Sequence, residues 1–395
     1  MDFTGIKYLI VGAGITGLTI AERLEVGHHN VVVIDKAKNI GGLCFDYIDP
    51  NTGIRCHKYG THVFHTNSRI VYDYISKFCT LNHYRHKIMI RWNKKCYPWP
   101  INLQTINMFF GMDSTPRHAE NVLNIIGTTF ANISVDHIEP AINTAAYRKS
   151  LPKQPPPTNM REALISRMGV KMYEAFVENY SLKQWGVDPS QLPASVATRI
   201  PVKTDYNTDF FGDRWQGVPE NGYEGLFASM TKNIPVHLGI NYFDIKSQIP
   251  KECVIIWTGP LDLWFEYRFG QLPWRGVKQE FSLHNLRDYQ GATIINYPET
   301  HIPHTRIHEF KHLHPENIHC SRRKTVIAHE YPNQNAEMSY PVQPDGVIAE
   351  AYREAATYEK NVVFCGRLAT YRYLNMDQAV LEALACAEKI CKQHQ

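Results

Sequence analysis

The residues with the clearest chemical use form a glycine-rich segment close to the N-terminus. Gly12, Gly14 and Gly17 make a GxGxxG pattern directly after the apolar run at residues 8–11. In a strand–turn–helix unit such glycines allow a tight turn, a close backbone approach to a pyrophosphate and close helix–strand packing. The free N–H groups at the helix start would hold the phosphates. Asp35 ends the next apolar run and would accept hydrogen bonds from a ribose, so the pattern predicts a dinucleotide site.

A second glycine pair indicates which dinucleotide. Gly41 and Gly42 follow six residues beyond Asp35. A further close backbone approach just past the ribose-binding acid is typical of flavoproteins, so we expect FAD rather than NAD. The expected cofactor-binding residues of this half are Gly12, Gly14, Ile15, Thr16, Gly17, Asp35, Lys36, Gly42 and Leu43.

The segment before the last predicted helix is the second half of the cofactor prediction. Tyr373, Asn375 and Met376 lead into a helix expected over residues 377–390. Free N–H groups at its start would stabilise the negative charge of a reduced flavin. Ordinary N-capping by Asp377 is the alternative, and both can hold because they use different N–H groups.

Three histidines, His57, His62 and His65, are close enough in sequence to suggest a metal site. Their spacings of five and three residues match no zinc motif, and no cysteine or acidic pair completes one. We therefore expect no bound metal and interpret the segment 60–62 as a loop that passes the flavin.

Arginines and tyrosines further along the chain have the chemistry of a diphosphate site. The planar fork of Arg199 or Arg306 suits phosphate oxygens, and tyrosine hydroxyls add single hydrogen bonds. Tyr180 has an aromatic face on which a nucleobase can stack. Pattern alone leaves a purely structural role open for each of these residues, including the tyrosines Tyr331, Tyr340 and Tyr373.

Composition narrows the class of protein. The chain has 395 residues, enough for more than one domain, and a net charge of only +4, which indicates no nucleic-acid partner. Nine cysteines without a CxxC pair indicate reduced thiols and a cytoplasmic protein. We find no signal peptide and no apolar run of the ~18 residues that a membrane helix needs, so no membrane insertion is expected.

The elements that must position these residues change character along the chain. The start and the end read as α/β, and between them lie a mainly helical stretch (101–187) and a strand-like stretch (201–350). This order predicts a discontinuous dinucleotide domain with two insertions. The expected helices are 102–111, 159–180 and 377–390, and the expected strands include 253–256, 292–295, 361–365 and an antiparallel pair within 84–99.

The chain resembles the bacterial-type UDP-galactopyranose mutases nearly from end to end. Beyond the glycine signature, the resemblance is carried by motifs that occur in the family's order: HKYGTHVFHT at 57–66, PINL at 100–103, KQWG at 183–186, LPAS at 192–195, PHTRI at 303–307, GRL at 366–368 and YRYL at 371–374.

The resemblance implies an α/β fold with a discontinuous Rossmann-like FAD-binding domain, an inserted helical bundle with a mobile substrate loop, and an inserted antiparallel β-sheet domain. The FAD-binding domain would comprise residues 1–80, 212–262 and 359–395. The bundle would comprise 100–190, and the sheet domain 81–99, 191–211 and 263–358.

The resemblance also implies a reaction without net redox change. In these mutases N5 of the reduced flavin bonds transiently to the anomeric carbon of the sugar and displaces the nucleoside diphosphate. The sugar opens and recloses as a furanose, and the diphosphate returns. The chain would thus interconvert UDP-galactopyranose and UDP-galactofuranose for cell-wall or lipopolysaccharide polysaccharide synthesis. An external reductant such as NAD(P)H would prime the flavin, and the protein would be a homodimer.

Carried over residue by residue, the resemblance assigns roles across the site. Arg199 and Arg306 would hold the diphosphate, and His62 would lie beside flavin and sugar. Trp185 would lie on the mobile loop. The expected substrate contacts are His86, Met108, Phe176, Tyr180, Ser181, Trp185, Phe210, Asn296, Tyr331 and Tyr373, and the further cofactor contacts are Tyr59, Gly60, Thr61, His62, Gly366, Arg367, Tyr373, Asn375 and Met376.

Several expected contacts depart from the family pattern. His86 and Phe210 stand in place of an asparagine and a tyrosine, while Met108, Val177 and Asn375 replace a glutamine, a phenylalanine and an aspartate. A more apolar base pocket would admit a thymine methyl group, so dTDP-fucopyranose is the alternative substrate for the same reaction. A flavin oxidase or dehydrogenase is a second alternative because it shares the N-terminal signature, and a non-catalytic flavoprotein is a third.

Overall fold

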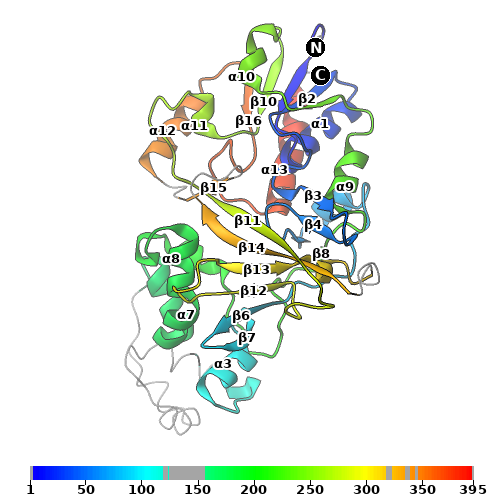
Figure 1. Ribbon diagram of the computed structural model, residues 1–395. Coiled ribbons are helices and arrows are strands. Elements are labelled where there is room, and N and C mark those ends of the chain that lie inside the picture. Colours follow the sequence, from blue (N-terminus) through cyan, green and yellow to red (C-terminus); the bar gives the residue numbers. More distant parts are fainter. Residues whose placement is uncertain are drawn as a thin grey trace.

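The computed structural model describes residues 3–118, 123, 156–316, 323–333, 339–342 and 346–393, except for the side chains of residues 198, 199, 339 and 393. Two large sheets form two lobes, and the segments near both chain ends belong to the upper lobe of Figure 1. The upper sheet contains β1 (Tyr8–Val11), β2 (Val31–Asp35), β9 (Val236–Leu238), β10 (Val254–Trp257) and β16 (Val362–Phe364). These strands are parallel and lie in the order β16-β10-β1-β2-β9.

Apolar residues bury both faces of this parallel sheet. Tyr8 and Ile10 of β1 face one core and Leu9 and Val11 the opposite one, because successive side chains of a strand alternate. The first core includes α1 (Ile15–Val26) and α13 (Met376–Gln393), and the second includes α10 (Tyr242–Ile245) and α11 (Leu261–Trp264). The two ends of the chain therefore share one Rossmann-like domain, which confirms the predicted discontinuous α/β fold.

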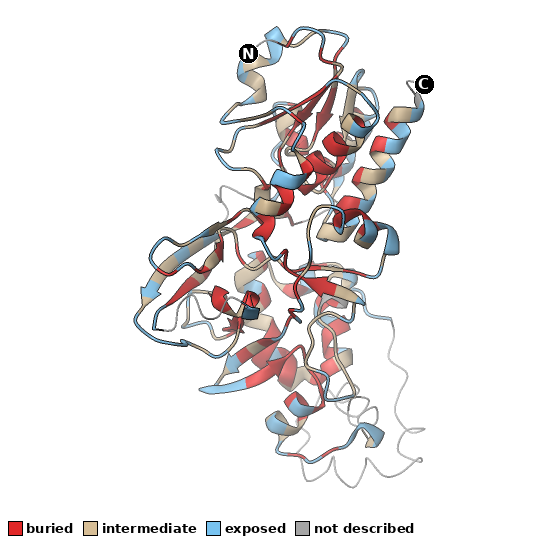
Figure 2. Ribbon diagram, turned by 90° about the vertical axis from the view of Figure 1, so that its right-hand side faces the viewer, coloured by how far each residue is buried: buried red, intermediate tan, exposed pale blue. Residues whose placement is uncertain are grey.

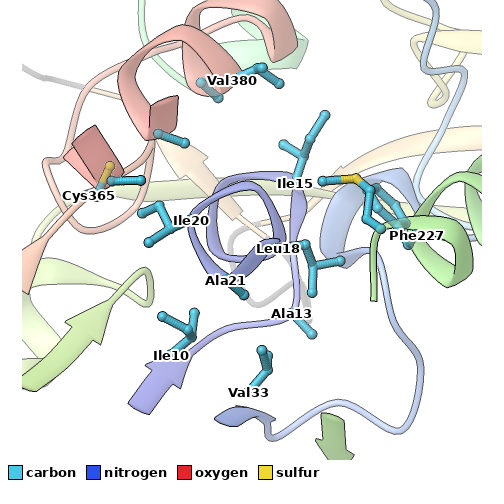
Figure 3. Packing of buried hydrophobic residues seen from close by; sticks show 14 of the residues in the cluster. Ile10, Ala13, Ile15, Leu18, Ile20, Ala21, Val33, Phe227, Cys365 and Val380 are labelled. Carbon is cyan, nitrogen blue, oxygen red and sulfur yellow. The ribbon is translucent and has the colours of Figure 1, made fainter. Parts of the chain in front are cut away.

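Close packing of α1 on the sheet depends on Gly17. Figure 3 shows α1 between the strand residues Ile10 and Val33 on one side and Val380 of α13 on the other. A Cβ on Gly17 would lie 2.0 Å from the backbone oxygen of Gly12 and 3.1 Å from Ile10 Cγ2. Only glycine fits this approach of helix and strand, as the spacing of the N-terminal glycines predicted.

The lower lobe is built on a second sheet. Its strands are β6 (Ile88–Trp92), β7 (Lys95–Trp99), β11 (Trp274–His284), β12 (Ile294–Asn296), β13 (Arg306–Glu309), β14 (Thr325–Asn333) and β15 (Ser339–Pro341). The order is β15-β11-β14-β13-β12-β6-β7 among the described strands. Neighbours are antiparallel except for β6 and β12, which are parallel. The expected antiparallel sheet is thus mixed, because the early β6–β7 hairpin joins strands that arrive after the helical insertion.

The helical part packs on this sheet through one shared core. It contains α3 (Leu103–Phe110), α7 (Met160–Tyr173), a π-helical turn (Glu174–Glu178) and α8 (Asn179–Trp185). Asn102 and Asn159 cap α3 and α7 through their side chains. The single helix predicted over 159–180 is wrong, because Gly169 (φ 76°, ψ 160°) interrupts α7 and the π-helical turn separates it from α8.

The remaining elements are short. They are the helices α2 (Arg69–Ile75), α9 (Gly222–Met230) and α12 (Val347–Ala356), the paired strands β3 (Asp46–Ile48) with β4 (Arg55–His57) and β5 (Phe64–Thr66) with β8 (Trp215–Gly217), and 3-10 turns at Gly42–Cys44, Pro189–Gln191, Ala194–Arg199, Lys246–Gln248 and Phe310–Leu313. Helix α9 lies in the stretch predicted to be strand-like, and its buried residues follow a helical spacing instead.

Burial follows the two sheets. Figure 2 shows buried residues along the strands and inner helix faces of both lobes, with exposed residues on the outward faces. None of the helices in the described ranges is both long and apolar enough to cross a bilayer.

We predict that Gly17→Ala destabilises the upper lobe by about 1–3 kcal/mol, because its Cβ would overlap a backbone atom that cannot move aside. The cofactor-free protein should unfold at a lower temperature than wild type. Gly14→Ala is the matched control, since a Cβ there meets nothing within 4 Å. Equal unfolding midpoints for the two variants would contradict this packing.

Candidate active site

The two glycine segments of the N-terminal signature form one continuous backbone surface. Gly41 N donates to Ala13 O at 2.8 Å, and a Cβ on Gly42 would lie 3.3 Å from Gly14 Cα. A Cβ on Gly14 itself would meet nothing within 4 Å, and no side chain caps α1 there. The helix start therefore keeps N–H groups and space for an anion.

Asp35 ends β2 beside this surface. Its two carboxylate oxygens accept hydrogen bonds from Ala13 N and Ala37 N, both at 2.7 Å. These bonds hold the carboxylate next to the glycine turn, while each oxygen keeps a second lone pair for a ligand hydroxyl. Lys36, which follows, is exposed.

The C-terminal segment closes the other side of α1. Gly366 (φ +90°) approaches so closely that a Cβ on it would lie 2.8 Å from Thr16 Oγ1. At the start of α13, Asn375 N donates to Gln378 Oε1 at 2.9 Å. Asp377 Oδ2 instead accepts from the threonine that ends β5, at 3.2 Å. The cap is therefore supplied by Gln378, and Asp377 fastens α13 to β5.

A row of polar side chains crosses the lower sheet. The strand registers place Asn296, Arg306, Glu330 and Gln279 side by side on β12, β13, β14 and β11, with their side chains on one face. Tyr180 of α8 lies over this row, with its ring centroid 5.9 Å from Arg306 Cζ. We call the four sheet residues Asn296, Arg306, Glu330 and Gln279 the polar row.

Glu330 is the centre of the polar row. Its Oε1 lies 2.8 Å from Arg306 Nε, and its Oε2 accepts hydrogen bonds from Gln279 at 2.9 Å and from His308 Nε2 at 3.0 Å. Burial by itself raises the pKa of this carboxyl group, but the charge of Arg306 and these bonds outweigh it and lower the pKa to about 2. Burial likewise opposes the charge of Arg306, and Glu330 more than compensates, so the pKa of Arg306 is raised. The site therefore holds a charged ion pair in which Glu330 is buried and Arg306 is partly buried.

Hydrogen bonds connect this ion pair to the loop between β4 and β5. Because ionised Glu330 can only accept, His308 Nε2 donates to it, and His308 Nδ1 accepts from Thr61 Oγ1 at 2.8 Å. Burial lowers the pKa of His308, which agrees with a neutral ring. Gly60 (φ +94°) lies against the same carboxylate, since a Cβ on it would be 3.0 Å from Glu330 Oε2. The loop and the polar row are therefore one hydrogen-bonded unit.

His62 presents a ring nitrogen that can accept a hydrogen bond. Its backbone N–H donates to His57 Nδ1 at 3.0 Å, and its own Nδ1 donates to the Gly60 carbonyl at 2.8 Å. Burial lowers the pKa of His62 to about 4, so the ring is neutral at pH 7 and Nε2 carries the lone pair. His62 can therefore accept from a ligand hydroxyl.

The three histidines of this segment have separate partners. His57 is buried beneath the backbone of His62, and His65 Nδ1 lies 2.7 Å from Asp213 Oδ2. Among the described residues, the group whose ligand atoms lie within 4.8 Å of one another is elsewhere, at Asp288, Glu309 and His312.

A group of aromatic side chains surrounds Trp185 at the end of α8. Trp185 meets Tyr340 edge-on with 5.8 Å between ring centroids, and its ring lies 6.4 Å from that of Tyr373. Arg367 stacks on Tyr373, with its Cζ 3.9 Å from the ring centroid. Helix α8, β15 and the C-terminal segment therefore meet at this point.

The structure brings Tyr340, and not Tyr331, to this group. Neighbouring residues of a strand point to opposite faces, so Tyr331 points away from the face that carries Glu330. Its partner in register is Lys278 of β11. Tyr340 therefore lies where a tyrosine contact was expected of Tyr331, and the substrate contact itself stays a prediction.

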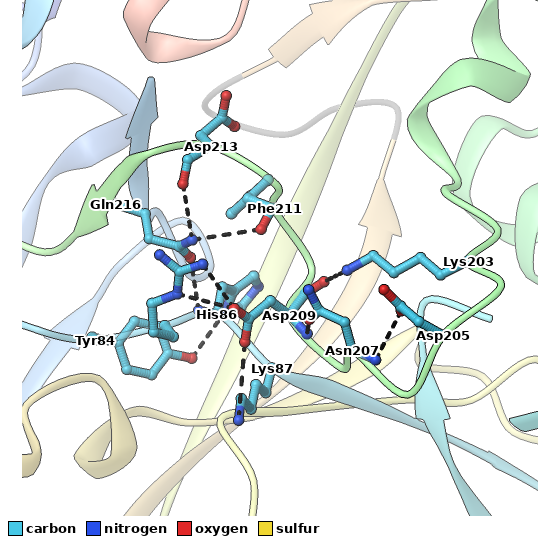
Figure 4. A network of polar contacts seen from close by, with 11 residues as sticks. Tyr84, His86, Lys87, Lys203, Asp205, Asn207, Asp209, Phe211, Asp213 and Gln216 are labelled. Carbon is cyan, nitrogen blue, oxygen red and sulfur yellow. Dashed lines mark hydrogen bonds and ion pairs between the residues drawn. The ribbon is translucent and has the colours of Figure 1, made fainter. Parts of the chain in front are cut away.

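His86 lies in a polar and aromatic network, which Figure 4 shows together with Gln216 and Phe211. Its backbone N–H donates to Gln216 Oε1 at 3.1 Å. Phe211 stacks on its ring with 5.5 Å between centroids, and Phe210 meets it edge-on at 5.6 Å. Burial, and then the charge of Arg306, lowers the pKa of His86 to about 3. His86 is thus a neutral, aromatic-covered side chain within electrostatic reach of the polar row.

Two expected substrate residues are placed differently, and a third expected site residue cannot be placed. Phe176 is fully buried among aromatic rings, 5.1 Å from that of Phe109, and as placed it offers no surface to a ligand. Met108 is exposed on α3. The side chain of Arg199 lies outside the described residues, so its role stays a prediction.

The remaining expected site residues lie in or beside the elements already described. Ile15, Thr16 and Ser181 are buried near the starts of α1 and α8. Leu43 lies in the turn at 42–44, whose Cys44 Sγ is 3.4 Å from Met376 Sδ. Lys58 Nζ lies over the ring of Tyr59, 5.0 Å from its centroid.

Buried polar atoms without a partner mark where a ligand would bind. Asn296 Oδ1, the Tyr340 hydroxyl and Arg367 Nε are buried and have no hydrogen-bond partner within the described part of the chain. An unsatisfied buried polar group costs about 1–3 kcal/mol, so native proteins usually pair such groups. These atoms lie at the polar row, in the aromatic group and in the C-terminal segment, and they indicate a ligand site where the three meet.

Fold and site together define a class: a Rossmann-type nucleotide-binding enzyme whose second lobe offers a partly buried cation among aromatic side chains. Comparison with known proteins makes this specific. A family model described as UDP-galactopyranose mutase matches residues 175–373, and one described as an NAD(P)-binding Rossmann-like domain matches residues 10–78.

Relatives that match over nearly the whole chain support the same family. The chain is 32% identical over 387 residues to a probable UDP-galactopyranose mutase of Klebsiella pneumoniae, covering 96% of this chain and 94% of that protein. It is 31% identical over 399 residues to a dTDP-fucopyranose mutase of Escherichia coli, covering 98% and 99%. A crystal structure of reduced UDP-galactopyranose mutase shares the fold, with a TM-score of 0.70 at 15% identity over 98% of this chain and 96% of that one. The chain belongs to the UDP-galactopyranose mutase family and is an isomerase, as its motifs predicted.

Sequence reasoning did not single out Glu330, Gln279 or His308. A signal for them was present, because Arg306 and His308 are polar at alternate positions of a short strand and so point to one face. The partner strands could not be aligned with β13 from sequence, so the acceptor for these side chains stayed hidden.

We predict that Glu330→Gln destabilises the protein by about 1–3 kcal/mol, because the partly buried Arg306 would lose its charged partner. Glu280→Gln is the matched control on neighbouring β11, where the ion pair with Lys278 is exposed and a far smaller change is expected. Urea unfolding measures both variants. Similar losses in the two would argue against the central role of Glu330.

The pKa of Glu330 also predicts a dependence on pH. A carboxyl group whose pKa falls on folding stabilises the native state above its unfolded pKa, and the contribution is lost as the pH falls toward the folded value. For Glu330 this contribution is therefore lost as the pH falls from 4.5 to about 2. Between these values wild type should lose more stability in urea unfolding than Glu330→Gln, and parallel curves would contradict the assignment.

Proposed function

We propose that the protein interconverts UDP-galactopyranose and UDP-galactofuranose with FAD as its cofactor. The observation that carries this proposal is the link from Arg306 through Glu330 and His308 to Thr61, in the loop expected to pass the flavin. A diphosphate bound at Arg306 would bring its sugar toward the cofactor.

The residues present fit FAD. The open space above Gly14 at the start of α1 suits a pyrophosphate, and the free lone pairs of Asp35 suit a ribose. Arg367 Nε, which lacks a partner among the described residues, suits an acceptor group of the cofactor. When bound and reduced, the flavin supplies a nucleophilic nitrogen for the anomeric carbon. Isomerisation needs no net electron transfer, so a reductant such as NAD(P)H would act only to prime it.

The chain's own residues would bind and orient the substrate. Arg306 would hold the diphosphate, with hydrogen bonds from Tyr340 and Tyr373, and Tyr180 would stack on the base. A diphosphate held in place after it separates from the sugar can return at high effective concentration. Neutral His62 would accept a hydrogen bond from a sugar hydroxyl.

dTDP-fucopyranose is the second candidate, and the wall around His86 favours it. Phe210 carries no hydroxyl, and Phe211 covers the His86 ring. Beside such a wall a sugar methyl group is accommodated, whereas a hydroxymethyl group would lose a hydrogen bond.

Product analysis by NMR tests both candidates. Dithionite-reduced enzyme should convert UDP-galactopyranose to its furanose without consuming oxygen or reductant in proportion. A higher kcat/KM for dTDP-fucopyranose would change the proposed substrate. Stoichiometric oxygen use without a furanose product would overturn the proposal in favour of an oxidase.

We predict that Arg306→Lys lowers kcat/KM by about 100-fold while bound FAD is retained, because an ammonium group cannot grip a diphosphate bidentately. Lysine keeps a positive charge opposite Glu330, so the fold should survive where Arg306→Ala would leave the carboxylate unpaired. Arg69→Lys, in an exposed pair with Asp73, is the control. Wild-type kcat/KM in Arg306→Lys would remove Arg306 from the site.

A further inference from the structure

A lysine ammonium joins α8 to the loop between β12 and β13. Lys183 lies in the last turn of α8, and its Nζ is within hydrogen-bond distance of four backbone carbonyls. The oxygens are those of Tyr297 at 2.5 Å, Ile302 at 3.0 Å, His304 at 3.1 Å and Glu299 at 3.2 Å. An ammonium group has three donors and no acceptor, so it suits a cluster of carbonyls, with one N–H shared between two of the four oxygens.

The loop held by Lys183 connects two residues of the polar row. Asn296 ends β12 immediately before Tyr297, and Arg306 begins β13 two residues after His304. The conformation of residues 297–304 therefore affects the positions of the Asn296 and Arg306 side chains.

The same end of α8 is also held from the opposite side. Arg275 of β11 donates from Nη2 to Lys183 O at 2.8 Å and from Nε to Gln184 O at 3.0 Å. Gly186 (φ +74°) ends the helix against this guanidinium, since a Cβ on it would lie 3.2 Å from Arg275 Cζ. The last carbonyls of the helix are thus capped by a cation, the favoured arrangement at a C-terminus. Trp185 lies inside this anchored stretch.

We propose that Lys183 is a positioning residue, whose ammonium fixes the ligand-facing side chains Tyr180 and Trp185 of α8 relative to Asn296 and Arg306. Its effect on turnover rests on the proposed function, whereas its effect on the loop does not. Replacing Lys183 leaves four carbonyls without their shared donor, so α8 and the loop should move apart even without a ligand.

The charges around Lys183 support a titratable contact. On the loop side it faces Glu299 and His304, with His329 of β14 behind His304, and on the helix side Arg275 binds the backbone. Burial lowers the pKa of Lys183 to about 8, and Glu299 opposes this in part. Burial also lowers the pKa of His304 to about 4, so His304 stays neutral while Lys183 titrates. The ammonium is present below this pKa and is lost as the pH rises through it.

Hydrogen exchange on the FAD-loaded protein without substrate tests the contact directly. In Lys183→Met, amides of 182–186 and 297–304 should exchange about tenfold faster than in wild type, as expected for one lost anchoring contact. Wild-type protection of these amides should weaken as the pH passes about 8, after correction for intrinsic exchange, and the variant should lack this step. Lys392→Met, which removes an exposed pair with Glu388, is the control and should change neither segment.

Kinetics test the consequence for the site. Lys183→Met should raise KM for the nucleotide sugar about tenfold with a smaller change in kcat, because substrate-contacting groups move while the cofactor stays bound. Lys183→Arg keeps the charge but cannot converge its planar donors on four carbonyls, so an intermediate KM is expected. Unchanged exchange and KM in both variants would overturn the proposal. A wild-type protein without mutase activity would refute the proposed function and leave the exchange result standing.

Discussion

Arg306 and Glu330 face each other on neighbouring strands, 2.8 Å apart, with Glu330 buried and Arg306 partly buried, and the surrounding structure is arranged around their charges. A buried carboxylate is costly unless its lone pairs are used, and Gln279 and His308 use them. His308 in turn accepts a hydrogen bond from Thr61 in the loop between β4 and β5. Isolated, this ion pair would be weak evidence for stability. Because its partners come from separate strands and from the loop between β4 and β5, it holds these elements together.

The two lobes contribute different chemistry to the candidate site. The upper lobe supplies backbone: glycines whose missing Cβ atoms let α1, β1 and the turn at residues 41–42 approach one another. The lower lobe supplies charge and aromatic faces: Arg306 under Tyr180, and Trp185 against Tyr340. An upper lobe of this type is shared with enzymes of other chemistry, so the identity of the reaction depends on the lower lobe and on the C-terminal segment that carries Arg367 and Tyr373.

Sequence reasoning succeeded where a feature is local. The close approach allowed by Gly17 and the strand–turn–helix unit follow from residues a few positions apart, and the motifs of the family were recognisable in order. It failed where a conformation or a contact depends on packing. Gly169 interrupts a helix whose apolar pattern appears continuous, and β6 pairs in parallel with a strand that lies about two hundred residues further on.

The sequence by itself determined the nucleotide-binding half of this protein, because a glycine turn, an acidic strand end and a helix start are set by neighbouring residues. Tertiary structure alone decided the other half. It placed Tyr340 in the aromatic group in place of Tyr331, because the alternation of β14 turns Tyr331 away once Glu330 faces Arg306. It also decided the partners of Glu330, His308 and Lys183, because those partners lie on strands and loops whose register no local pattern specifies.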